Sequence, residues 1–144
     1  MDDVAVTQAL AARVTAVSGP TGYAPIRKAY AFPPDAISQT PSVLVMAQGD
    51  SMEYGGQTRR TVVTFAVRIY LEPVADLARR IQMMTAYRTW LRDLYNGAVT
   101  LGGLVDQASC VSTDLGADEF GGVNYLTVEA RIECVKQEAV SFTA

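Results

Sequence analysis

The chain contains no histidine, and this absence removes most of the usual routes to enzymatic catalysis. Without histidine there is no Ser-His-Asp or Cys-His arrangement, and with only two cysteines there is no ordinary zinc site. Most hydrolytic and metal-dependent reactions also lose their usual general base. These absences predict a protein that is not an enzyme, with no catalytic residue, no metal ligand and no cofactor.

Other absences concern the compartment and the partners. No run approaches the roughly 18 consecutive apolar residues of a membrane-spanning helix, so no contact with a membrane is expected. Cys110 and Cys134 are too few for a disulfide framework, and they predict free thiols on strands. The first residues are acidic where a secretory signal would be basic, which predicts mature cytoplasmic sequence. A formal net charge of -3 argues against fixed binding to nucleic acid.

The composition that is present is typical of one globular domain. Apolar residues make up 49% of the 144 residues, which predicts a single domain over 1–144. Val6, Leu10, Val14 and Val17 lie about one turn apart, so they predict an N-terminal amphipathic helix within 1–18. The polar residues 136–144 predict a C-terminal tail that becomes ordered only on a neighbour.

Alternation of apolar and polar residues predicts the sheet. Four segments have the pattern of strands, and they cover 42–47, 61–71, 102–116 and 123–135, while a further short strand is expected near 26–30. Every second residue from Thr61 to Leu71 and from Leu126 to Cys134 is predicted to point inward. An apolar stripe at helical spacing predicts a long helix from Pro73 to about Asn96. Together these segments predict an α+β fold: a mostly antiparallel four- to five-stranded sheet with a long helix packed on one face and an N-terminal helix.

The polar, glycine-rich residues 48–60, QGDSMEYGGQTRR, predict a long extended loop between two strands. Hairpin connections usually take about two to five residues, so a loop of this length indicates a function. The glycines suggest a phosphate-binding loop, but no lysine occurs between positions 29 and 135, and no helix follows the loop. We therefore interpret it as an assembly arm. Its apolar anchors and polar clamps are Met52, Tyr54, Arg59 and Arg60.

Two groups of acidic residues are candidates for chemical sites. Asp114, Asp118 and Glu119 lack the spacing of a calcium-binding loop, and with the glycines of 116–122 they predict a solvated acidic loop. A pair formed by Glu129 and Glu133 predicts a surface charge ladder or inter-subunit ion pairs, since Arg131 lies between them on the same strand face.

In the order of its elements the chain resembles the tail terminator (tail completion) proteins of long-tailed bacteriophages, the siphophages. The resemblance is carried by VRIYLEPVADLARRIQMMTAYRTWLRDLYN, by LGGLVDQ at the start of the next strand, and by the closing NYLTVEARIEC. It implies a virion structural protein of the tail and neck, assembled in the host bacterial cytoplasm. Its copies would form a homohexameric ring that caps the tail tube and joins it to the head-tail connector.

The resemblance also implies the partners. These are further copies of the chain, the tail tube protein and a neck or connector protein, while DNA passes through the lumen without specific binding. An acidic chain suits such a lumen, because fixed phosphate contacts would slow the passage of DNA.

No catalytic residue follows from the resemblance, but a protein interface does. The residues expected to form it are Met52, Tyr54, Arg59, Arg60, Arg68, Tyr70, Arg79, Tyr87, Glu119, Phe120, Glu129, Arg131 and Glu133. One alternative is another neck or connector ring protein for head completion, or a tail tube subunit. An alternative of a different class is a small-molecule or peptide-binding module that uses the sheet face beneath 48–60.

Overall fold

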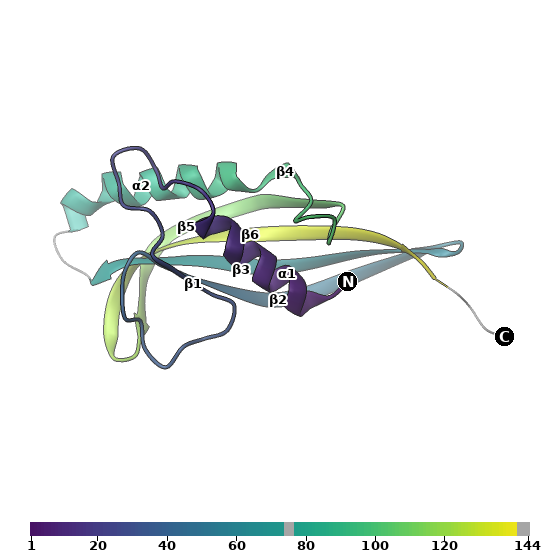
Figure 1. Ribbon diagram of the computed structural model, residues 1–144, viewed down its shortest axis with the longest axis horizontal. Helices are drawn as coiled ribbons and strands as arrows, with labels where there is room; N and C mark the ends of the chain where they lie inside the picture. The colour runs from purple at the N-terminus through teal and green to yellow at the C-terminus, as the bar shows by residue number, and fades with distance from the viewer. Residues whose placement is uncertain (74–76, 141–144) are drawn as a thin grey trace.

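The computed structural model describes residues 1–73 and 77–140, without the side chains of residues 77–79 and 98. Within these residues the chain forms two helices and one six-stranded sheet (Figure 1). The helices are α1 (Asp3–Thr15) and α2 (Leu77–Leu94). The strands are β1 (Lys28–Tyr30), β2 (Ser42–Gly55), β3 (Thr58–Pro73), β4 (Asn96–Val99), β5 (Gln107–Phe120) and β6 (Val123–Ala139). In the sheet their order is β1-β2-β3-β6-β5-β4, and only β1 and β2 pair in parallel.

The predicted fold is wrong. In place of a mostly antiparallel four- to five-stranded sheet with a long helix on one face, the six strands form a mixed, curled sheet, a half-barrel with two short helices. Strands occupy roughly half of the chain. The predicted helix began at Pro73, but β3 continues through that residue. The short strand expected near residues 26–30 forms as β1, whereas the sequence pattern missed β4 because four residues are too short to show an alternation.

The predicted loop 48–60 is wrong in the same way, because those residues belong to a β-hairpin. β2 continues to Gly55 and β3 begins at Thr58, so a two-residue turn joins them. Gly56 has φ +61°, a conformation that suits glycine at the first position of such a turn. The predicted acidic loop 116–122 is likewise a hairpin that turns at Gly121 and Gly122. Residues 136–139, predicted as tail, continue β6.

Both helices pack on one face of the sheet, which we call the covered face. On α1, Val6, Leu10 and Val14 are fully buried, as predicted from their spacing, whereas Val17 lies beyond the end of the helix and is 40% exposed. The side chains predicted to point inward from the two longest strands are buried as well. They are Thr61, Val63, Phe65, Val67, Ile69 and Leu71 on β3 and Leu126, Val128, Ala130, Ile132 and Cys134 on β6. This face therefore holds the main hydrophobic core.

A side-chain cap marks the start of α1, and a hydrogen bond joins α1 to the residue that follows α2. The Asp2 side chain accepts a hydrogen bond from Ala5 N at 3.1 Å, which caps the start of α1. Tyr95, one residue beyond α2, is buried and donates a hydrogen bond to the Leu10 carbonyl at 2.7 Å. This bond fixes the end of α2 against the middle of α1.

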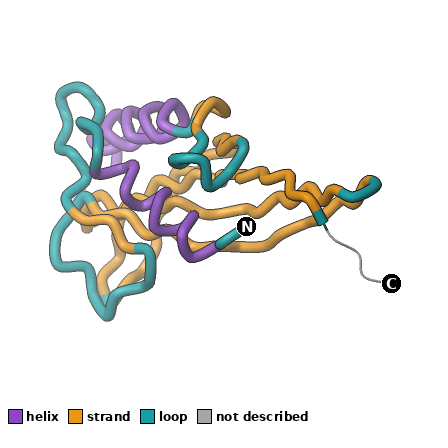
Figure 2. Tube along the Cα trace, turned by 45° about the vertical axis from the view of Figure 1, so that its right-hand side comes forward, coloured by secondary structure: helices purple, strands orange, loops and turns teal. Residues whose placement is uncertain are grey.

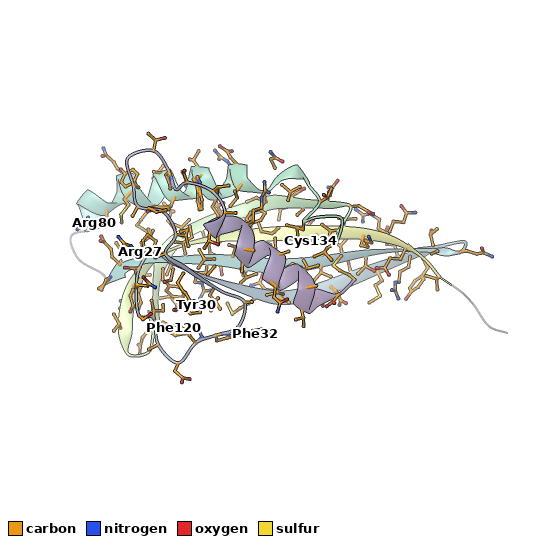
Figure 3. All side chains as sticks on the ribbon, viewed as in Figure 1. Arg27, Tyr30, Phe32, Arg80, Phe120 and Cys134 are labelled. Atoms are coloured by element: carbon orange, nitrogen blue, oxygen red, sulfur yellow. The ribbon has the colours of Figure 1, made fainter. Side chains whose placement is uncertain are left out.

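The opposite face, which we call the open face, carries a second and smaller apolar cluster. Leu44, Tyr70 and Tyr125 are buried there, with Tyr30 and Phe120 packed against them (Figure 3). The proline-rich residues 31–41 cross this end of the sheet, and Gly121 of the β5–β6 turn packs close to the backbone of Asp35 and Ala36. The small cluster is thus confined to the end of the sheet that lies opposite the β2–β3 turn.

Candidate interaction surface

The arm, residues 48–60, projects beyond the helices as a three-stranded ribbon (Figure 2). Its β3 residues Thr58–Arg60 pair with Gln137–Ala139 of β6, and Val140 N donates to the Gln57 carbonyl at 2.7 Å. No described helix lies over it in Figures 1 and 2. The arm is therefore held by backbone pairing on both sides of β3 and not by a hydrophobic core.

The two predicted apolar anchors lie side by side on the arm. Met52 is 46% exposed and Tyr54 is 61% exposed. Their partners across the ribbon, Thr61 and Arg59, show that both side chains lie on the covered-face side of the sheet. The Tyr54 hydroxyl lies 3.7 Å from the Met52 sulfur. Together they form an exposed apolar pair on a surface that the helices do not reach.

The two predicted polar clamps lie on opposite faces of β3. Arg59 Nη2 lies 3.5 Å from a carboxylate oxygen of Glu138, and the other oxygen of Glu138 accepts from the Met1 ammonium at 2.8 Å. The hydrogen bond from this ammonium is the main reason why the pKa of Glu138 is lowered. Arg60 is exposed and pairs in register with Glu53 of β2. Arg59 is thus engaged within the protomer, whereas Arg60 faces solvent.

A polar cluster on the open face joins three strands through Arg68. Its guanidinium donates to Asp118 at 2.6 Å, to Glu129 at 2.9 Å and to the Tyr70 hydroxyl at 3.3 Å. Burial raises the pKa of Tyr70, Arg68 opposes this shift, and the Asp118 carboxylate adds to it. Because Arg68 already has two carboxylate partners, the cluster is a cross-strand clamp and not a pre-formed anion site.

The other predicted interface residues are dispersed over the molecule. Phe120 packs edge-on against Tyr70, with ring centroids 5.6 Å apart, and Glu119 is exposed beside it at the end of β5. Arg131 is exposed and Glu133 half-buried on the open face of β6. The structure thus brings Arg68, Tyr70, Glu129 and Phe120 together but does not place Arg131 or Glu133 in that cluster.

The two interface residues predicted on α2 have different outcomes. Tyr87 is 1% exposed, donates to the Ala24 carbonyl and packs against Tyr23 and Trp90, so it is used within the protomer. The side chain of Arg79 lies outside the described residues.

Across the described residues, no group of three or more histidine, cysteine or acidic side chains could hold a metal ion. Burial raises the pKa of Cys134 to about 12, so this thiol is not an activated nucleophile, and Cys110 is also free. Neither described helix is long and apolar enough to cross a membrane.

Sequence reasoning missed two acidic partners, Asp118 and Glu138. Asp118 was interpreted as part of a solvated loop, and Glu138 as part of a tail. Folding the chain back at Gly121–Gly122 would have placed Asp118 opposite Tyr125 and close to the β6 residues that approach Arg68. No comparable sequence signal identifies Glu138, since its pairing depends on how far β6 continues along the arm.

No protein-family model matches the chain, and no curated protein sequence matches it. The curled sheet, the arm and the open-face clamp are therefore the features from which a function is inferred.

Proposed function

We propose that this chain is a structural virion protein, a tail terminator of a long-tailed bacteriophage. Its copies form a homohexameric ring that caps the tail tube and joins it to the head-tail connector. The observation that carries the proposal is the arm: a paired ribbon that extends past the helix-covered body and exposes Met52 and Tyr54. Exposed apolar side chains on a rigid projection are typical of protein-protein contact sites.

A ring also requires two different surfaces on each protomer that meet head to tail. The arm lies at one end of β6, and the β5–β6 turn with Glu119 and Phe120 lies at the other. The 17 residues of β6 separate these ends by roughly 55 Å at the rise of a strand. The protomer therefore has distinct surfaces at its two ends, one for each neighbouring layer or copy.

The polar groups of the open face support a structural role over a chemical one. The Arg68 clamp is paired internally, and the net charge of -3 suits a channel through which DNA passes without fixed contacts.

Electron microscopy of virions carrying a shortened arm tests the proposal. Because Glu53 pairs with Arg60, residues 53–60 can be replaced by Asn-Gly without changing the register of the remaining strands. We expect a folded protein with a nearly unchanged Tm, and virions that lack the six-fold layer between tube and connector. A substitution of the exposed Asp93 on α2 by Lys serves as a control that keeps this layer.

Three results would contradict the proposal. A layer of twelve copies would indicate a connector protein, many stacked layers would indicate a tube subunit, and normal virions from the shortened arm would remove the function assigned to the arm.

A further inference from the structure

β2 and β5 each have an outer edge of which a large part is not paired with any other described strand. β1 pairs with β2 only at Ser42–Leu44, and β4 pairs with β5 only at Ala108 and Ser109. The free edges are therefore residues 46–55 of β2 and 111–120 of β5, which are equal in length. Neither contains lysine or proline, the residues that commonly block edge pairing. Each presents unpaired backbone groups to another strand.

The directions of the strands determine how a second copy can add. β2, β3, β6 and β5 are neighbours in that order, and each pair is antiparallel. Over four alternating strands, β5 runs opposite to β2. We infer that the free edge of β5 in one copy pairs, antiparallel, with the free edge of β2 in a second copy of this chain. Every copy can repeat this contact, because it uses a different edge on each side.

The two free edges are staggered along the strands, and this stagger fits a closed assembly. Met46 is level with Ala66, through the β2–β3 register. Ala66 in turn is level with Arg131 and Ser112 on β6 and β5. Without a stagger, Met46 would therefore lie opposite Ser112 of the neighbour. When Met46 pairs with Phe120 instead, the neighbour is displaced along the strands by the length from Ser112 to Phe120, roughly 27 Å. A shift of this kind occurs in closed barrels, where tilted strands accumulate a stagger around the circumference.

End-to-end alignment of the edges also gives Met52 a partner. Each edge contains one bulge, between Ala47 and Gly49 on β2 and between Cys110 and Ser112 on β5. Because both strands carry one extra residue, side chains on the same face of the two edges remain opposite each other. Met52 then lies opposite Leu115, which packs against the main core on the covered-face side. In the next position Glu53 opposes Asp114, and two like charges directly opposite each other weaken the contact.

Disulfide trapping tests this pairing. Ser51 opposes Gly116 in the inferred register, and paired Cα atoms at about 4.5–5.5 Å allow a disulfide. A Cβ at Gly116 would make only an ordinary contact with Thr127, at 3.8 Å. In a Cys110→Ser background, we expect the variant S51C/G116C to form a ladder of dimers, trimers and larger oligomers on oxidation. The control S51C/S112C, four positions out of register on the same face, should remain uncross-linked.

A charge substitution gives an independent measurement. Glu53→Gln removes the repulsion with Asp114 without placing a lysine on the edge, which should tighten self-association roughly two-fold by sedimentation. Asp93→Asn makes the same charge change on the exposed side of α2 and should leave association unchanged. Equal effects of both variants would show that net charge, and not the edge contact, controls assembly.

The outcomes distinguish this inference from the proposed function. Only the closure of the paired copies into a ring rests on that function. A six-fold layer in virions without a cross-linked ladder would overturn the edge pairing and leave the tail terminator proposal intact. A ladder without such a layer would do the reverse. Dimers from S51C alone would show that two β2 edges pair with each other, and this would overturn the inference. A protein that stays monomeric and never cross-links would overturn it as well.

Discussion

The two halves of β2 both pair with β3, on either side of the bulge between Ala47 and Gly49, but they have opposite surroundings. Ser42–Val45 are buried on both faces, whereas every residue from Ala47 to Gly55 is exposed. The first half lies between α1 and the small cluster on the open face, and neither of these reaches the second half. The difference teaches that the burial of a strand depends on what packs over it and not on the strand itself.

The two halves also depend on different forces. The covered base of the sheet is stabilised by apolar surface removed from water. The arm relies on backbone hydrogen bonds to β3 and on the pairing of β3 with β6, because a two-stranded hairpin alone is marginally stable in water. Substitutions in the base should therefore change stability more than substitutions in the arm, and a change in the proposed assembly is expected from the arm.

The largest effect is expected for Phe65→Ala, which removes a fully buried ring from the covered base. It should lower the free energy of unfolding by about 3–5 kcal/mol, measured by denaturant titration. Tyr54→Ala, which also removes an aromatic ring, should change it by less than about 0.5 kcal/mol because the ring is exposed. Similar losses from both variants would show that the arm is part of the core.

A smaller effect is expected for Tyr95→Phe, which removes the hydroxyl that bonds the Leu10 carbonyl. The buried carbonyl loses its partner, so the free energy of unfolding should fall by about 1–3 kcal/mol. Tyr54→Phe is the matched control in the arm, since its hydroxyl is exposed and contacts only the Met52 sulfur. If both changes proved neutral, the joint between α1 and α2 would not depend on this bond.

Arg68→Met tests the clamp on the open face. Asp118 and Glu129 lose their common cation, but the groups are partly exposed, so the expected cost at neutral pH is only about 1 kcal/mol. The cost should shrink at a pH low enough to protonate both carboxylates. Arg92→Met, at an exposed pair with a separation of 3.9 Å, is the control and should be neutral. A loss that does not change with pH would point to packing and not to charge.

The smallest effect concerns Glu138 of β6, which pairs with Arg59 of the arm and with the Met1 ammonium. Its folded-state pKa is lowered from 4.5. Its contribution to stability is thus present above that value and is lost as the pH falls through the lowered pKa. Glu138→Gln should lower Tm by about 1–2 °C at pH 7, and the difference from the wild type should vanish in acid. A difference that persists in acid would contradict the ion pair. Glu119→Gln, at the exposed end of β5, is the control.

The sequence by itself determined which side chains of α1, β3 and β6 enter the main core. A period of two over 61–71 and over 123–135 identified the buried residues of β3 and β6, and a period near 3.6 identified those of α1. These periods are local properties of the backbone, so they can be recognised without knowing the fold. The absence of histidine likewise excluded several kinds of catalytic site before any contact was known.

Only the tertiary structure decided that residues 48–60 and 116–122 are strands and that the sheet is mixed and curled. Exposed strands such as 47–55 carry no apolar alternation, because no face of them needs to be buried, so their sequence is indistinguishable from that of a loop. Their conformation comes from hydrogen bonds to strands distant in the sequence, as when Thr58 pairs with Ala139. Long-range pairing of this kind also brings Arg68 to Asp118 and leaves two edges free, which no local pattern could show.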